Sequence, residues 1–163
     1  MTLSVEQTAL RHAHQLCLGH RDALLDALTD LDQRSLAAAD LERLSPPDRR
    51  MLDQFAYRYT RLQDDMGTRL FPAILRALGE EIAAMPVLDR LARLEQLGWL
   101  PSAEEWSDLR RIRNEFTHDY PETTEERFAR LQLAIQAARR LLQLLSGIGL
   151  NIERRFPVSP APK

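Results

Sequence analysis

The chain has little glycine, cysteine or aromatic content, and each shortage narrows the class of protein. Its 163 residues include 6 glycines, one cysteine and 6% aromatic residues. The single thiol, Cys17, cannot form an internal disulfide, which argues against a small disulfide-stabilised secreted domain. With so few glycines, the abundant Leu, Ala, Arg and Glu favour helix.

Neither sign of charge dominates the chain. Its 22 Lys and Arg residues stand against 24 Asp and Glu residues, a formal net charge of −2 at pH 7. The molecule as a whole therefore does not attract nucleic acid, and any RNA binding needs a local basic patch. No apolar run approaches the roughly 18 residues that span a bilayer, and no basic segment followed by an apolar run opens the chain. We expect a cytoplasmic protein with no membrane segment.

Apolar residues recur at helical spacing along most of the chain. They predict helices over about residues 3–28, 48–80, 86–97, 102–120 and 123–146, with a weaker helical piece near 36–44. Pro72 predicts a kink or break just before it. Ser102 and Thr123 are each followed three residues later by glutamate, the pattern of a helix N-cap. No segment alternates with period two, so we expect an all-α, antiparallel bundle of four to five helices.

The length suits one domain with a substantial core. We expect residues 1–146 to form this single helical domain. The helical pattern fades after residue 146, and the last stretch contains three prolines. Residues 147–163 are therefore predicted to be a mobile C-terminal tail.

The stretch 113–120 carries the most informative chemistry. On an ideal helix Arg113 lies at the edge of an apolar stripe, where a guanidinium needs a partner or a cavity. The ordinary interpretation is an ion pair with an acidic residue of another helix, and Asp64 is one residue that could approach this segment. His118 lies roughly 140° away from Arg113 around a straight helix. The two side chains would converge only if the helix unwinds near Pro121, or if two copies pack together.

An arginine and a histidine in one cleft suit phosphodiester chemistry. A guanidinium grips phosphate with two hydrogen bonds and stabilises developing charge, and an imidazole moves a proton near neutral pH. RNA supplies its own nucleophile, the 2′-OH, so we expect neither a metal nor a cofactor. The ordinary alternative stays open, because a lone histidine near a helix end is more often structural or solvated.

Two other clusters have simple interpretations. His14, Cys17 and His20 are three residues apart, but their side chains fan out over roughly 240° of a helix, which disfavours a metal site. The spacing of Arg61, Asp65 and Arg69 by four residues predicts an ion-pair ladder on the surface of a helix.

The 113–120 stretch resembles a known signature. Arg113, His118 and Tyr120 match the Arg-x4-His-x-Tyr motif of HepT proteins in the HEPN superfamily, and an asparagine such as Asn114 commonly follows that arginine. The surrounding helices are also similar to a branch of HepT-like sequences. The resemblance covers roughly residues 50–145.

This resemblance implies a dimeric helical bundle in which two motifs line one cleft. It implies a metal-independent endoribonuclease that leaves a 2′,3′-cyclic phosphate. Arg113 would bind the scissile phosphate, His118 would act as acid or base, and Asn114 would orient or polarise the site. The protein would be the toxin of a type VII-like toxin–antitoxin pair. Its antitoxin, a MntA-type minimal nucleotidyltransferase, would add AMP to Tyr120.

The expected partners are thus RNA, that nucleotidyltransferase and a second copy of the chain, in a dimer or higher oligomer. A different class of function remains an alternative: a non-catalytic HEPN protein that serves as substrate-binding or scaffold partner of a minimal nucleotidyltransferase. It predicts a tight complex and no nuclease activity. The intact motif favours the nuclease.

Overall fold

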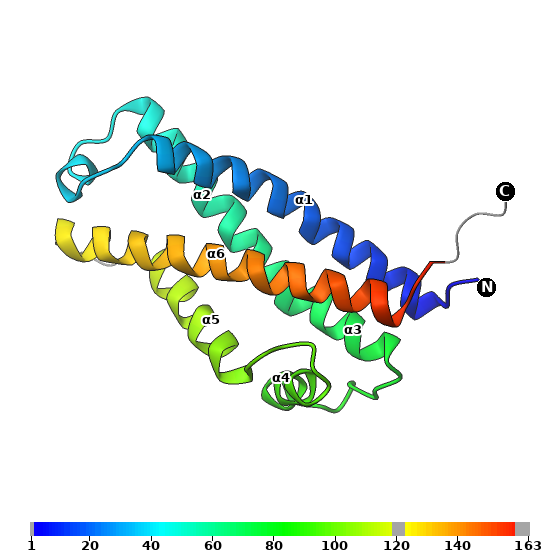
Figure 1. Ribbon diagram of the computed structural model, residues 1–163. Helices are drawn as coiled ribbons and strands as arrows, with labels where there is room; N and C mark the ends of the chain where they lie inside the picture. Colours follow the sequence, from blue (N-terminus) through cyan, green and yellow to red (C-terminus); the bar gives the residue numbers. More distant parts are fainter. Residues whose placement is uncertain (1, 119–122, 159–163) are drawn as a thin grey trace, which may run out of the picture.

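The computed structural model describes residues 2–118 and 123–158, and every regular element in them is helical (Figure 1). The elements are α1 (Val5–Gln33), the 3₁₀ turn η1 (Ala38–Leu41), α2 (Pro46–Asp65), the π-helical turn η2 (Met66–Leu70), α3 (Phe71–Ala77), α4 (Val87–Gln96), α5 (Ala103–Thr117) and α6 (Thr124–Arg155). Because α2, η2 and α3 follow one another without a gap, they form one continuous rod. The predicted all-α class is confirmed. None of these described helices is long and apolar enough to cross a membrane.

Helices α1, α2 and α6 run lengthwise through the molecule, and α4 and α5 lie on one side of them (Figure 1). The chain reverses direction between α1 and α2, and these two helices share the most extensive packing. The start of α1 and the end of α6 meet at the same end of the molecule. There the Arg11 guanidinium binds the carboxylate of Glu153 and the main-chain oxygen of Phe156.

The predicted starts of α5 and α6, at Ser102 and Thr123, are confirmed. The hydroxyl of Ser102 accepts a hydrogen bond from the Glu105 amide at 3.1 Å, and that of Thr123 accepts one from Glu126 at 3.2 Å. These bonds satisfy amides that the first turn of a helix leaves without partners. The expected kink or break before Pro72 takes the form of the π-helical turn η2. This turn contains one extra residue, so the side chains that follow it point in a different direction around the helix axis.

Helix α6 is longer than predicted. The expected tail over residues 147–163 was wrong for its first part, because the helix continues to Arg155 and buries Ile148 and Ile152 completely. These two residues continue the apolar seam of the helix, so the pattern was present in the sequence but interrupted by two glycines. Residues 159–163 lie outside the described part of the chain.

One of those glycines permits close packing between α6 and α1. A Cβ added at Gly149 would stand 3.2 Å from Nε2 of His14 in α1, closer than side chains normally approach. The glycine therefore weakens the helical signal in the sequence while it allows the two longest helices to touch. Packing, rather than helix propensity, decides this segment.

The core contains a buried hydrogen-bonded pair between α1 and the end of α2. Nε2 of His20 lies 2.8 Å from Oδ2 of Asp65, and the two residues are only 7% and 4% exposed. Arg58 approaches the other ring nitrogen, Nδ1, at 3.5 Å. A guanidinium can only donate, so this contact favours the tautomer in which Nε2 carries the proton and donates it to Asp65.

The prediction of an ion-pair ladder on the surface of the helix was therefore wrong for its central residue, Asp65. Arg69 and Arg61 do approach Asp65, at 3.4 and 3.9 Å, but the carboxylate between them is buried and its shortest bond goes to His20. The spacing of four residues was identified correctly, and the exposure of its middle member was not. Burying a carboxylate costs free energy, so the buried position of Asp65 depends on the histidine and the two arginines around it.

The thiol of Cys17 is expected to be inert in the folded protein. Burial, assisted by the negative charge of Asp65, raises the pKa of Cys17 to about 12, and the thiolate is the reactive form. We expect no alkylation by iodoacetamide at pH 8 until the protein is unfolded in urea, as followed by mass spectrometry. Because the unfolded thiol titrates near pH ~8.5, stability should fall as pH rises above that value, since only the unfolded state releases the proton. Rapid alkylation under native conditions would contradict this assignment.

Candidate active site

Helix α5 ends earlier than predicted, at the point where the candidate site begins. The expected end near Tyr120 was wrong, because the last helical residue is Thr117 and His118 has extended backbone with φ −78° and ψ 134°. His118 is therefore released from the helical spacing that separates it from Arg113. Tyr120, the predicted acceptor of AMP, lies outside the described residues.

The Arg113 guanidinium is held by two oxygen atoms. Its NH2 group donates to Oδ2 of Asp64 in α2 at 2.7 Å, and its NH1 group donates to Oδ1 of Asn114 at 3.2 Å. The predicted pairing of Arg113 with an acid of another helix is confirmed. Its side chain is only 24% exposed, so the partners fix a charged group close to the core. Nη1 and Nη2 each carry a second N–H group, the type of donor that binds carboxylates and phosphates.

An aromatic cluster fixes α5 against α2 beside Arg113. The rings of Phe55 and Tyr59 stack with centroids 5.6 Å apart, and Phe116 of α5 contacts both. The Tyr59 hydroxyl is buried and has no hydrogen-bond partner among the described residues. Burial raises the pKa of Tyr59, and the nearby positive charge of Arg113 opposes this only in part. Tyr59 is thus a neutral phenol at physiological pH, packed next to the candidate phosphate-binding arginine.

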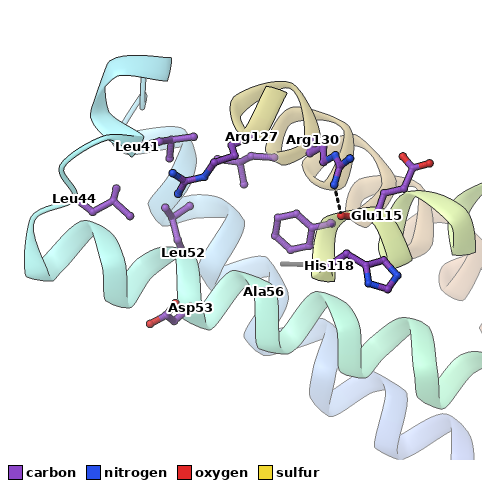
Figure 2. Close-up of a pocket in the computed structure, with 11 residues that line it drawn as sticks. Leu41, Leu44, Leu52, Asp53, Ala56, Glu115, His118, Arg127 and Arg130 are labelled. Carbon is purple, nitrogen blue, oxygen red and sulfur yellow. Dashed lines mark hydrogen bonds between the residues drawn. The ribbon is translucent and has the colours of Figure 1, made fainter. Parts of the chain in front are cut away.

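His118 lines a pocket of about 280 Å³ between α2, the end of α5 and the start of α6 (Figure 2). Arg127 and Arg130 enter it from α6, and the NH1 group of Arg130 donates to the main-chain oxygen of Glu115 at 3.0 Å. Leu41, Leu44 and Leu52 lie at the other end of the pocket, away from the imidazole (Figure 2). His118 itself is exposed. The pocket is thus lined by an imidazole and two arginines, and the guanidinium of Arg127 points toward the leucines rather than toward the imidazole (Figure 2).

Sequence reasoning missed Arg127 and Arg130. The signal was available, because two arginines three residues apart share one face of the helix that follows the motif. What the sequence does not contain is the angle at which α6 returns along α5. That angle brings this face next to His118.

Arg113 and His118 line separate pockets within the single chain. Arg113 belongs to a second pocket, of about 370 Å³, with Gln63, Asp64, Trp106 and Asn114. The structure brings Arg113 and Asn114 together and places His118 on another side. Early unwinding of the helix is therefore not sufficient to bring Arg113 and His118 into one pocket. Among the described residues, no three His, Cys, Asp or Glu side chains are grouped closely enough to hold a metal ion.

Comparison with known proteins gives no match. No protein-family model fits the chain. No curated protein and no solved structure matches it significantly. The HepT-like motif at residues 113–120 thus remains a resemblance carried by its own residues.

Proposed function

We propose that this protein is a metal-independent endoribonuclease of the HepT type, the toxin of a pair whose antitoxin is a MntA-type nucleotidyltransferase. One observation carries the proposal. The exposed His118 stands at the end of α5 in a pocket with Arg127 and Arg130, while Arg113 on the same helix is held in place by Asp64 and Asn114. A group suited to proton transfer and a group suited to phosphate binding are thus five residues apart in the sequence, although they line different pockets of the single chain.

In the proposed reaction, the imidazole of one His118 takes the proton of the 2′-OH. The 2′ oxygen attacks the phosphorus, and the bond from phosphorus to the 5′ oxygen breaks. A protonated imidazole, that of His118 in a second copy, gives its proton to the leaving 5′ oxygen. The products are a 2′,3′-cyclic phosphate and a 5′-OH end. Guanidinium groups stabilise the charge that develops on the non-bridging oxygens.

The second copy enters the proposal because one chain keeps Arg113 and His118 in different pockets. Two chains packed around a two-fold axis would bring equivalent surfaces face to face. We therefore propose that the active cleft lies between two copies. Native mass spectrometry is expected to show a dimer, and the cleavage rate per chain should fall on dilution below its dissociation constant.

The deciding experiment incubates purified protein with total RNA in EDTA and maps the new ends. Cleavage with cyclic-phosphate ends is the expected result. The mass of the protein is measured first, because an AMP group on Tyr120 would block the cleft by bulk and negative charge. Absence of cleavage by chains of unmodified mass would overturn the nuclease proposal.

The second candidate function is that of a non-catalytic partner of a nucleotidyltransferase. The ion pair between Arg113 and Asp64 favours it, because a carboxylate already occupies part of the guanidinium that a phosphate would need. This function predicts a stable complex with a small nucleotidyltransferase and intact RNA in the assay above. Complex formation alone is expected for both functions, so the RNA assay separates them.

A further inference from the structure

Gln63 is a buried amide whose hydrogen-bonding groups are unused. The residue is 3% exposed, and neither Oε1 nor Nε2 has a hydrogen-bond partner among the described residues. Buried polar side chains in native proteins nearly always have such partners, so each exception needs an explanation. Gln63 lies one helical turn beyond Tyr59 on α2, on the face that packs against α5.

The amide borders a pocket large enough for a small molecule. Gln63 lines the pocket of about 370 Å³ between α2, η2, α4 and α5, a volume within the lower range of ligand sites. Pro72, Leu91 and the ring of Trp106 form apolar walls. The pocket is thus lined by apolar and by charged side chains, and Gln63 borders it with an amide that is itself buried.

A second buried polar atom belongs to the same pocket. Nε of Arg113 is buried and has no hydrogen-bond partner in the described chain, although the outer nitrogens of its guanidinium bind Asp64 and Asn114. The π-helical turn η2 contributes Gly67 and Thr68 to the lining, and turns of this kind are frequent at functional sites. A buried amide without partners and one buried guanidinium nitrogen without a partner, from two helices, therefore adjoin one cavity.

The chemistry of these groups selects one class of ligand. A glutamine amide presents an acceptor and a donor side by side, the complement of a nucleobase edge, and the amide of Gln or Asn pairs with adenine in this way. Apolar and aromatic walls suit the faces of a flat heterocycle. The guanidinium of Arg113 and the exposed Arg110 suit the attached phosphate.

We propose that this pocket is a nucleobase subsite, in which Gln63 reads the edge of a base, adenine above the others, and Arg113 binds the adjoining phosphate. The inference rests on the proposed function and extends it, since the subsite would decide which nucleotide of RNA lies next to the scissile bond. It names a pocket separate from the one lined by His118. Binding at the subsite needs no cleavage, so it can be measured by itself.

The binding experiment uses the fluorescence of Trp106. The sequence has two tryptophans, so a Trp99→Phe background leaves Trp106 as the only emitter. The full-length protein in this background is titrated with AMP, GMP, CMP and UMP to millimolar concentration. We expect quenching with AMP bound most tightly, by about tenfold over the weakest nucleotide. A protein with Trp106→Phe, which keeps Trp99, should show no quenching.

Three variants assign the effect to the pocket. Gln63→Leu should reduce the preference for AMP at least about fivefold, whereas Gln54→Leu, the same change at an exposed position of α2, should leave it intact. Val87→Trp should weaken binding of all four nucleotides, because Val87 lines the pocket and is 56% exposed, so a larger ring there blocks the space without disturbing the core.

Thermal melting completes the test. Gln63→Leu removes a buried polar group that has no partner, so the unliganded variant should melt at the same temperature as the parent or higher. Loss of base preference in a variant that is not destabilised is the signature of a binding role. A lower melting temperature would indicate that Gln63 has a structural partner and would overturn the proposal.

The results of the binding and cleavage experiments distinguish the subsite proposal from the ribonuclease proposal. Base-selective quenching that depends on Gln63, without RNA cleavage, supports the subsite and overturns the ribonuclease. Cleavage that depends on His118, with no quenching by any nucleotide and no change of cleavage sites in Gln63→Leu, overturns the subsite alone. Equal quenching by all four nucleotides in parent and Gln63→Leu protein also overturns it.

Discussion

Replacing His118 with alanine is expected to slow RNA cleavage about 10²–10⁴-fold, the usual contribution of one general acid or base. The melting temperature should stay the same, because His118 is exposed and follows the last residue of α5. The measurement is the single-turnover rate on a defined RNA in EDTA, with the ends of the products mapped. A large loss of rate in a fully folded protein would place the imidazole in the reaction.

The matched control is His12→Ala. His12 is also exposed, on α1, and lines no pocket described above. Its replacement should leave the rate unchanged, so that any common effect of purification or of a lost surface histidine is excluded. Equal activity of the His118→Ala protein and the parent would remove His118 from the mechanism, even if the RNA is cut.

The largest effect on stability is expected at the buried pair of His20 and Asp65. Replacing His20 with leucine should lower the free energy of unfolding by about 3–5 kcal/mol, because it leaves the Asp65 carboxylate buried without its closest partner. The two residues lie 2.8 Å apart and are nearly inaccessible to water, so solvent cannot replace the lost hydrogen bond. Urea unfolding followed by circular dichroism measures the change.

A double variant tests the interpretation. If the cost comes from the buried carboxylate left without its partner, His20→Leu combined with Asp65→Leu should cost less than the sum of the two single changes, since an apolar pair replaces a buried hydrogen-bonded pair. Asp53→Asn, at an exposed carboxylate of the same helix, should change stability by no more than about 0.5 kcal/mol. Additive costs in the double variant would show that the pair contributes through packing alone.

The local elements of the fold were predictable because their causes are local. Ser102 and Thr123 cap their helices through side chains that act within four residues, and Pro72 disturbs the turn just before it. The pairing of Arg113 was predictable in kind, since a guanidinium at the edge of an apolar stripe must find an acid. The end of α6 was predicted too early because its glycines have low helix propensity. In the structure, packing against α1 keeps this segment helical.

The parts that escaped prediction depend on distant contacts. The spacing of Arg61, Asp65 and Arg69 is the same on an exposed face and on a buried one, and only the position of His20, 45 residues earlier, shows which it is. Gln63 gave no signal, because an isolated glutamine is ordinary on any helix. Its lack of partners exists only once α5 covers it.

The sequence by itself determined an all-helical chain and the starts of its later helices, and it predicted chemistry at the Arg113–His118 segment. These follow from periodicity, capping and the charge of single side chains, which act over a few residues. Only the tertiary structure decided that Asp65 belongs to the core, that Arg127 and Arg130 line the same pocket as His118, and that Arg113 and His118 occupy separate pockets. The physical reason is that burial and convergence are properties of helices packed against one another, and the angles between those helices are set by the whole core.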